Sequence, residues 1–517
     1  MKRNSVIVVL SLIAAMFISS SFASDTPRFK WRGYMLDVSR HFFTVDEIKK
    51  MLDLMREHDL NVFHWHLTDG NGWRLEIDRY PNLTKAGAVR KSSTKRWSTM
   101  WIDGHDGEYG PFFYTKEQVR DVIRYASERG ITIVPEIDIP GHSGAAITAY
   151  PSLGCTNCYN SGELCLGKES TFEMYKNILD EVIELFPGKV IHTGGDECSG
   201  VNWKKCVDCQ ARIRELGLKN SHDLQGWATK RFAEYLEKKG RRLMGWDELA
   251  TWDDLPRSVI IQSYRGAEYG VVAAKKGFDV VMSPDTFCYL DYVQGLEGDL
   301  EEYQPFGVIV DIAKIARFDP CAGIPKEFHK HILGGQGNLW TELVTDWKGV
   351  EWRTWPRLAA IADVLKNGPA EDVPAFVKRM DSVRADLVRR GVNASPVGPL
   401  FKKVPDLLPG ARYELIKADE NKRFDFAKML DNPLDMSVLR FDHNNKSDSF
   451  RHIYATRDTT MAKGTYRIDM NFDKISMWAP DDEGFKKGLE QMKAIARSKH
   501  GGVMEFTGAI IVGGFEK

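Results

Sequence analysis

Short segments rich in β-branched and aromatic residues alternate with amphipathic helical stretches along most of the chain, and this alternation constrains the fold most. Strands are expected at residues 33–38, 61–67, 131–137, 189–194, 242–246, 259–263, 279–282 and 331–336. Helices are expected at residues 45–58, 116–129, 171–186, 223–239, 267–276 and 350–366. Eight strands with intervening helices predict an α/β fold, a (β/α)8 TIM barrel, rather than an open doubly wound sheet. No Gly-x-Gly-x-x-Gly motif follows a strand, so the fingerprint of a dinucleotide-binding fold is missing.

The composition is that of a globular protein. Of 517 residues, 43% are hydrophobic and 28% are charged, which excludes a wholly disordered, collagen-like or polytopic membrane chain. The formal net charge is −1. Because nucleic-acid-binding proteins usually carry a basic excess, we expect no nucleic-acid partner.

The N-terminus has the features of a secretory signal peptide. Lys2 and Arg3 precede an apolar run at residues 6–18, and Ser21-Phe22-Ala23 offers a small-x-small cleavage site. The run is short for a membrane span, which disfavours the alternative of an uncleaved anchor. We therefore expect residues 1–23 to be removed, leaving an extracytoplasmic protein, secreted or periplasmic, with no stable membrane insertion.

All eight cysteines follow this segment. Cys155-x-x-Cys158 and Cys206-x-x-Cys209 have the spacing of a four-thiolate zinc site. In an exported protein, however, disulfides are the more frequent use of cysteine, and we expect disulfides and no metal or cofactor. The sequence does not fix their connectivity.

Polar and aromatic side chains gather at the C-terminal ends of the expected strands, where the active sites of such barrels lie. Carboxylates and arginine can bind sugar hydroxyls in bidentate fashion, and aromatic rings can stack on the apolar face of a pyranose. No nucleophilic Ser or Cys motif is evident, so the combination favours carbohydrate chemistry. The residues at these ends are Asp37, Arg40, Asp69, Glu136, Asp138, His142, Asp196, Glu197, Trp246, Asp247, Glu248, Tyr289, Asp291, Trp340 and Glu342.

The adjacent pair Asp196-Glu197 is the strongest candidate for acid–base chemistry. Glycoside hydrolysis needs a carboxylic acid that protonates the leaving oxygen. Adjacent residues of a regular strand point to opposite faces, but Gly194-Gly195 permits a bend that would turn both side chains to one pocket.

Taken together, the motifs resemble glycoside hydrolase family 20, the β-N-acetylhexosaminidases. The motifs occur in family order across roughly residues 30–390, and their combination is far more specific than any one of them. They are Gly-Tyr-Met-Leu-Asp-Val-Ser-Arg (33–40), His-Trp-His-Leu-Thr-Asp (64–69), Gly-Trp-Arg (72–74), Pro-Glu-Ile-Asp-Ile-Pro-Gly-His-Ser (135–143), His-Thr-Gly-Gly-Asp-Glu (192–197), Gly-Trp-Asp-Glu (245–248), Tyr-Leu-Asp-Tyr (289–292) and Gln-Gly-Asn-Leu-Trp-Thr-Glu (336–342).

The resemblance implies an exo-acting enzyme that removes terminal β-linked N-acetylglucosamine or N-acetylgalactosamine from glycans or chitooligosaccharides. It implies a retaining mechanism in which the substrate's own 2-acetamido oxygen attacks the anomeric carbon. Glu197 would be the general acid and then the base, and Asp196 would orient the acetamide. We expect burial beside Asp196 to keep Glu197 protonated near neutral pH.

The resemblance also assigns the substrate-binding residues. Tyr289 would hydrogen-bond the acetamide oxygen, and Trp246, Trp340 and a third aromatic residue, here Tyr264, would wall the sugar. Arg40, Asp291 and Glu342 would bind hydroxyls at the closed end of the pocket. Asp69 and His142 complete the expected set, with His142 and His192 orienting carboxylates.

Several positions depart from the family pattern. The third pocket aromatic is usually Trp, so Tyr264 puts the size of the pocket in question. The usual second Asp after His-Trp-His-Leu-Thr-Asp is Gly70, and Ala362-Asp363 and Leu365 replace the usual Ala-Glu and Trp. The small α+β domain that commonly precedes the barrel is not expected here.

The expected barrel spans residues 24–395, and residues 396–517 show no motif of the family. There we expect a small α+β accessory region of unknown role, with strands at 438–441, 465–471 and 508–512 and a helix at 482–499. Two rival functions stay open. One is a non-catalytic glycan-binding relative, and the other is a metal-dependent hydrolase using His64-x-His66, His142, His192, Asp69 and Asp138. Oligomeric state is not indicated.

Overall fold

The computed structural model describes residues 26–397, except 92–93, 99–100, 106, 157–161, 293 and 295–309. Beyond residue 397 it describes six strands and residues 463–465, 480–488 and 490. The expected signal peptide therefore lies outside the described residues. Among the described residues, none of the helices combines the length and apolar character needed to cross a bilayer.

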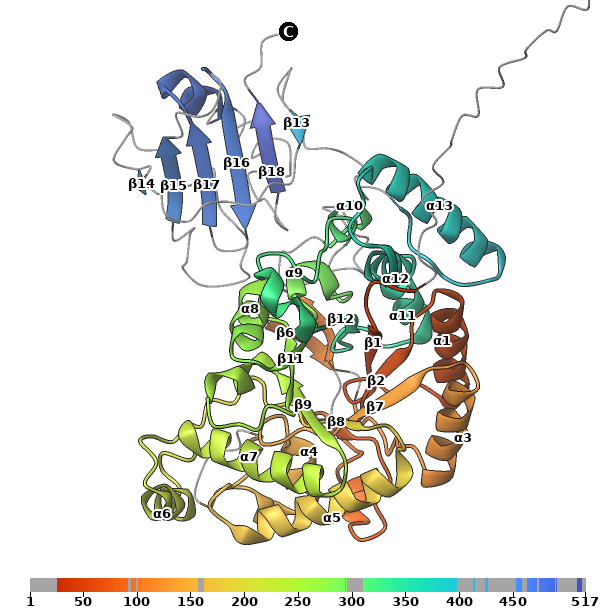
Figure 1. The fold of residues 1–517 in the computed structure, drawn as a ribbon, viewed down its shortest axis with the longest axis vertical. Coiled ribbons are helices and arrows are strands. Elements are labelled where there is room, and N and C mark those ends of the chain that lie inside the picture. Colours follow the sequence, from red (N-terminus) through yellow and green to blue (C-terminus); the bar gives the residue numbers. More distant parts are fainter. Residues whose placement is uncertain are drawn as a thin grey trace, which may run out of the picture.

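Eight parallel strands close into a barrel, in the order β1-β2-β7-β8-β9-β10-β11-β12, with β12 returning to β1 (Figure 1). All eight expected strands are confirmed. At the closing seam Trp31 lies opposite Gly334 and Leu36 opposite Leu339. The strands are β1 (Trp31–Asp37), β2 (Val62–His66), β7 (Thr132–Glu136), β8 (Val190–His192), β9 (Arg242–Trp246), β10 (Ile260–Ser263), β11 (Asp279–Met282) and β12 (Ile332–Leu339).

Helices cover the outside of the barrel, and five of the six expected helices are confirmed: α1 (Val45–Glu57), α3 (Lys116–Ser127), α5 (Glu169–Leu185), α7 (Asp223–Lys238) and α8 (Ala267–Lys275). The single helix expected at 350–366 is wrong. Two helices, α11 (Trp347–Thr354) and α12 (Arg357–Asn367), replace it, because Pro356 lacks a backbone N–H and keeps Trp355 extended, with ψ 137°.

Further elements were not expected from the sequence. The longer ones are α6 (Val207–Leu216) and α13 (Val373–Arg389). The short helices are α2 (Asn82–Lys85), α4 (Gly144–Ala149), α9 (Asp285–Cys288) and α10 (Ile312–Ile315). Two hairpins complete this part, β3 (Thr68–Asp69) with β4 (Gly72–Trp73), and β5 (Thr94–Ser98) with β6 (Trp101–His105).

The C-terminal region contains a mixed sheet in the order β13-β18-β16-β17-β15-β14. Its strands are β13 (Arg412–Tyr413), β14 (Phe424–Asp425), β15 (His452–Arg457), β16 (Tyr466–Asn471), β17 (Lys474–Ala479) and β18 (Ala509–Gly513). The strands expected at 465–471 and 508–512 and the start of the helix at 482 are confirmed, which supports an α+β region. The strand expected at 438–441 lies outside the described residues.

The barrel interior changes from apolar to polar along its axis. An apolar cluster fills one level of the interior, formed by Trp31, Val62, Val134, Met244, Ile260 and Val281. Side chains two residues further along a strand face the same side. His64, Glu136, Trp246 and Gln262 follow members of this cluster at that spacing and are buried. Because of this two-residue period, polar side chains line the interior from the apolar cluster towards the C-terminal ends of the strands.

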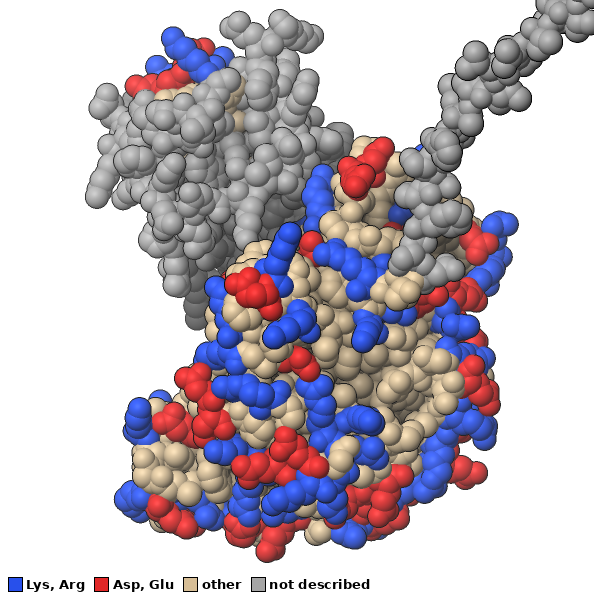
Figure 2. Space-filling model, in the orientation of Figure 1, with Lys and Arg blue, Asp and Glu red and all other residues tan. Residues whose placement is uncertain are grey.

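Charges of both signs mix on the outer surface. On the face in view, Lys and Arg side chains are interspersed with Asp and Glu over the described residues (Figure 2). This distribution fits the near-neutral formal charge of the chain.

Two glycines turn the chain where β8 ends. Gly194 and Gly195 have φ of 62° and 100°, in the left-handed region that favours glycine. A Cβ at position 194 would lie 1.7 Å from Asp138 Oδ1, and one at position 195 would lie 2.8 Å from Leu249 Cδ2. The expected bend before Asp196-Glu197 is therefore present.

We predict that Gly194→Ala destabilises the protein by about 2–5 kcal/mol, since it combines an unfavourable φ with overpacking against a buried carboxylate. Gly240→Ala is the matched control, because Gly240 has φ 70° but nothing within 4 Å of its added Cβ. That control isolates the backbone cost, about 1–2 kcal/mol. The measurement is the thermal midpoint of each variant. Equal losses in both variants would contradict the role of the Asp138 contact.

Candidate active site

A buried network of three histidines around Glu136 forms the lower layer of the site. His64 Nε2 and His66 Nδ1 lie 2.9 and 2.5 Å from Glu136 Oε2, and His192 Nδ1 lies 2.8 Å from Oε1. Trp246 Nε1 donates to Oε1 over 3.0 Å. Gln336 donates to His64 Nδ1 over 2.9 Å, so His64 presents its Nε2 proton to Glu136. Burial accordingly lowers the pKa of His64 to about 4.

From this layer an alternating chain of charges leads to the catalytic candidates. His66 Nε2 lies 3.0 Å from Asp69 Oδ2, and His142 Nδ1 lies 3.2 Å from Asp69 Oδ1. His142 Nε2 in turn lies 3.3 Å from Asp196 Oδ2 and 3.6 Å from Glu197 Oε2. The chain therefore runs from Glu136 through His66, Asp69 and His142 to the adjacent pair.

Burial and neighbouring charges shift the pKa values of the residues along this chain in opposite directions. Burial alone would lower the pKa of His66, but the carboxylates of Glu136 and Asp69 raise it well above its ordinary value. Asp69, and then Asp196, raise the pKa of His142 against the cost of burial. Asp69 is buried, yet Arg40 and His142 hold its pKa well below the ordinary range. Both histidines are therefore cationic at neutral pH.

Asp196 and Glu197 differ in environment. Asp196 is buried, its Oδ1 has no hydrogen-bond partner, and burial raises its pKa. The Glu197 side chain is 69% exposed, and its contact with His142 lowers its pKa. The expectation that burial keeps Glu197 protonated is therefore wrong for the substrate-free protein. Glu197 has φ 51° and His142 has φ 48°, left-handed values that are uncommon for residues other than glycine.

Arg40 forms the centre of a second group of charges. Its guanidinium contacts Asp37 Oδ2 at 3.1 Å, Asp69 Oδ2 at 2.9 Å and Glu342 Oε1 at 3.6 Å. It also lies 5.1 Å from the centre of the Trp340 ring. Burial, followed by the charge of Glu342, raises the pKa of Asp291 to about 8. Asp291 Oδ1 is buried without a hydrogen-bond partner.

Four aromatic rings form one connected wall. Trp246 lies 5.3 Å from Tyr264 and 5.7 Å from Trp340, measured between ring centres. Tyr289 lies 6.2 Å from Tyr264 and 6.3 Å from Trp340. Tyr289 also forms an isolated parallel bridge with Asn338 near the end of β12, which places it at the barrel rim. The predicted site residues are thus brought together at one end of the barrel.

The sequence reasoning left Glu136 and Glu248 without a specific role. Glu136 is the hub of the histidine network described above. Glu248 accepts hydrogen bonds from the Tyr264 hydroxyl at 2.9 Å and from the Glu197 backbone N–H at 3.4 Å. Burial, then Asp196, raises the pKa of Glu248 to about 7. Glu248 could have been found from its motif, Gly-Trp-Asp-Glu, because it follows Trp246 at the end of the same strand.

Two groups in this network have the residue types of a metal site, His64, Glu136 and His192, and His66, Asp69 and Asp138. In both groups the nitrogen atoms face carboxylate oxygens at hydrogen-bond or ion-pair distance. The geometry therefore favours an electrostatic network over the metal-dependent alternative.

The geometry and the sequence agree with a known enzyme family. The profile of glycosyl hydrolase family 20, catalytic domain, matches residues 29–368. This span contains every strand of the barrel and every predicted site residue. The chain belongs to glycosyl hydrolase family 20.

Individual relatives agree with this assignment. A beta-hexosaminidase of Porphyromonas gingivalis is 39% identical over 381 residues, 71% of this chain and 47% of that protein. A beta-hexosaminidase of Vibrio furnissii is 36% identical over 352 residues, 65% of this chain and 57% of that protein. The family 20 chain thus spans about half the length of these curated relatives.

Solved structures share the barrel. The GH20 exo beta-N-acetylglucosaminidase of Vibrio harveyi, in complex with N-acetylglucosamine, has a TM-score of 0.64 and 34% identity, over 72% of this chain and 60% of that one. The beta-N-acetylhexosaminidase of Bacteroides fragilis has a TM-score of 0.62 and 36% identity, over 72% of this chain and 74% of that one.

We predict that His142→Asn shifts the basic limb of the pH profile of kcat/KM to higher pH. The His142 imidazolium favours the Glu197 carboxylate, so its removal raises the pKa of Glu197, and the protonated acid persists to higher pH. The maximal rate falls on the order of 100-fold, because Asp196 loses its partner. The exposed His222→Asn is the control. An unmoved basic limb in His142→Asn would show that His142 does not set the protonation of Glu197.

Proposed function

We propose that this protein is an exported exo-β-N-acetylhexosaminidase that removes terminal β-linked N-acetylglucosamine and N-acetylgalactosamine by substrate-assisted, retaining hydrolysis. The observation that carries the proposal is the buried, unpartnered Oδ1 of Asp196, next to Glu197 and within the group of site residues that includes the aromatic wall. A buried acceptor without a partner suits a donor that arrives with the substrate, and the acetamide N–H of an N-acetylhexosamine is such a donor.

The first step forms the bond between the acetamide oxygen and the anomeric carbon and breaks the glycosidic bond. Glu197 donates its proton to the leaving oxygen. Asp196 accepts the acetamide N–H and stabilises the positive charge that develops on that nitrogen, while Tyr289 donates to the acetamide oxygen. Holding the nucleophile inside the substrate replaces a bimolecular attack by an intramolecular one.

The second step returns the enzyme to its starting state. Water attacks the anomeric carbon, the bond from that carbon to the acetamide oxygen breaks, and the Glu197 carboxylate accepts the proton. Two inversions give net retention of configuration. Binding of the sugar removes water from Glu197, which raises its pKa and supplies the protonated acid that the free protein lacks.

The charged group around Arg40 supports exo action. Arg40, Asp291 and Glu342 present a donor and two carboxyl groups that suit hydroxyls of a terminal sugar. With a pKa of about 8, Asp291 is protonated at neutral pH and can donate as well as accept a hydrogen bond. A closed polar end of this kind admits a terminal residue and disfavours binding within a chain.

Tyr264 carries a hydroxyl group, which the tryptophan usual at this position in the family does not have. Its ring contributes to the wall, and its hydroxyl donates to Glu248, which also accepts from the Glu197 backbone. Tyr264 therefore keeps an aromatic ring in the wall, and its hydroxyl links the end of β10 through Glu248 to the loop of Glu197.

Export rests on the signal-peptide features of residues 1–23. The test is the N-terminal sequence of the protein recovered from the extracytoplasmic fraction, which should begin at residue 24. Recovery of the full-length chain from the cytoplasm alone would overturn this part of the proposal.

We predict that the wild-type protein releases nitrophenol from the β-GlcNAc and β-GalNAc glycosides and splits chitobiose. Glu197→Gln loses about 10²–10⁴-fold on chitobiose, and less on the nitrophenyl glycosides, because nitrophenolate leaves without a proton. Asp196→Asn loses activity on both types of substrate. A thiazoline analogue of the intermediate inhibits competitively, and β-glucosides without the acetamide group are not hydrolysed.

Glu184→Gln, an exposed glutamate on α5, is the matched control and keeps wild-type rates. No wild-type turnover of any β-linked N-acetylhexosaminide between pH 4 and 8 would overturn the proposal. Sugar binding without turnover would identify a non-catalytic glycan-binding relative instead. Equal rates in wild type and Glu197→Gln on chitobiose would overturn the role of Glu197.

A further inference from the structure

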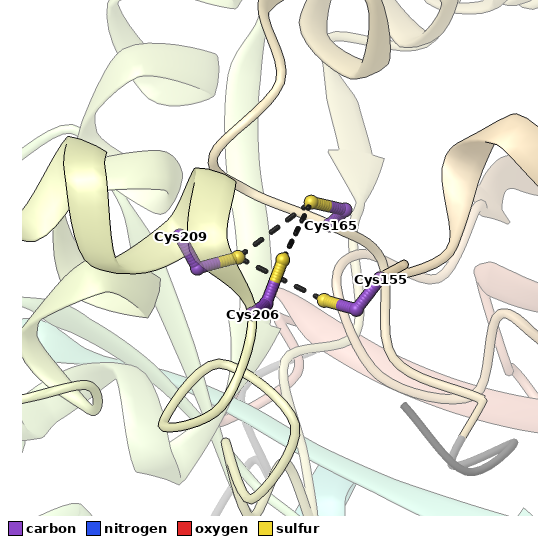
Figure 3. A group of neighbouring side chains, drawn as sticks. All are labelled: Cys155, Cys165, Cys206 and Cys209. Atoms are coloured by element: carbon purple, nitrogen blue, oxygen red, sulfur yellow. Dashed lines mark hydrogen bonds between the residues drawn. The ribbon is translucent and has the colours of Figure 1, made fainter. Parts of the chain in front are cut away.

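Four thiols from distant parts of the sequence meet at one point beside the catalytic loops. Cys206 and Cys209 come from the start of α6, and Cys155 and Cys165 from the loop that joins β7 to α5 (Figure 3). Sγ–Sγ distances are 3.6 Å for Cys165–Cys206 and Cys165–Cys209, and 3.8 Å for Cys155–Cys209. Three of these cysteines are buried and Cys155 is half-buried. The sequence spacing proposed Cys158 for this group, but among the described residues Cys165 takes the fourth place.

These distances match a metal-bound tetrahedron. A Zn–S bond is about 2.3 Å, so the edge of a ZnS4 tetrahedron is about 3.8 Å. A disulfide would bring one pair to about 2.05 Å and leave the other thiols apart. Cys165 is instead equidistant from two partners, and the four Sγ atoms all lie within 4.8 Å of one another. Among the seven described cysteines all thiols are free, so the expectation of disulfides is not confirmed.

The surrounding backbone is shaped to hold the four thiols together. A Cβ at Gly167 would lie 2.2 Å from the backbone of Asp208 and 2.3 Å from that of Cys209, so only glycine lets the loop approach α6 this closely. Cys206 is the N-cap of α6 and Cys209 lies in its first turn, where the helix dipole stabilises negative charge.

Two basic side chains hydrogen-bond the backbone next to two of the cysteines. Lys168 Nζ donates to the carbonyl oxygens of Ser152 and Gly154, at 3.0 and 2.9 Å, on the segment that leads to Cys155. Arg212 donates to the Gly167 carbonyl at 3.4 Å.

We propose that Cys155, Cys165, Cys206 and Cys209 bind a structural Zn²⁺ that fastens the loop carrying Asp196-Glu197 to the loop carrying His142. Binding replaces four thiol protons by four Zn–S bonds and needs no oxidant. The same two loops also meet directly, since Glu163 accepts from Ser199 Oγ at 2.9 Å and from the Gly200 N–H at 2.7 Å. Trp203 Nε1 donates to the Leu164 carbonyl at 2.8 Å. Four Zn–S bonds would add a stronger connection between the two loops than these hydrogen bonds alone.

The test measures metal content and thiol state in the full chain, purified without added metal, reductant or chelator. We expect about one zinc per chain by elemental analysis. Alkylation in denaturant with a chelator should modify all four thiols, as intact mass shows. Replacement by Co²⁺ should give the absorption bands of a tetrahedral thiolate site. Cys206→Ser/Cys209→Ser should lose the metal, and Cys321→Ser, a cysteine outside the cluster, should keep it.

Two disulfides among these four cysteines, with no bound zinc, would overturn the proposal. Iron in place of zinc would overturn the identity of the metal. If the double variant does not fold, the Co²⁺ spectrum and the zinc content of the wild type still decide the matter.

The effect of zinc on activity can be tested only if the proposed function is correct, whereas the measurement of metal content does not depend on that function. Loss of zinc should lower kcat on the order of 100-fold with a smaller change in KM, because Asp196 and Glu197 lose their fixed position. The thermal midpoint should fall in parallel. If zinc is bound but its removal changes neither kcat nor the thermal midpoint, the site does not fasten the catalytic loops. That result would overturn this part of the proposal.

Discussion

The ion pairs of Asp69 hold the site together. One buried carboxylate contacts Arg40, His66 and His142, which belong to three different strand ends. Each of these cations has a further carboxylate partner: Asp37 for Arg40, Glu136 for His66, and Asp196 for His142. Breaking such a group by removing one member leaves uncompensated charge in the interior, which is strongly destabilising. The same residue therefore fixes the arginine at the closed end, the buried network and the orientation of the catalytic pair.

The barrel produces this arrangement through the two-residue period of its strands. Val62, His64 and His66 face the interior in succession, and so do Val134, Glu136 and Asp138. An apolar base, a layer with His64 and Glu136, and a layer with His66 and Asp138 then follow one another towards the rim. The aromatic wall and Glu197 stand above them, where the strands give way to loops. Scaffold and site are therefore specified by the same inward-facing positions, with stability encoded at one end and chemistry at the other.

Much of this could be predicted from the sequence, because strand period and strand-end chemistry are local. All eight barrel strands follow from it, whereas the roles of the site residues, and Tyr264 as a member of the site, came from the resemblance to family 20. The failures have identifiable causes. Pro356 divides a helix whose apolar pattern continues across it. Glu197 is exposed because its left-handed backbone turns it towards solvent and His142, which no local pattern encodes. Cys165 joins Cys206 and Cys209 only through the tertiary approach of a loop to α6 at Gly167.

The seam of the barrel joins its first and last strands. Trp31 donates to the side chain of Gln336 across this seam, 305 positions along the chain. During synthesis, one edge of β1 consequently stays unpaired until β12 has been made, and an unpaired strand edge can pair with other chains. The histidine network depends on the same event, because Gln336 also fixes the proton of His64. The closed barrel and the fixed proton of His64 therefore both require β12, and a chain truncated before β12 would have neither.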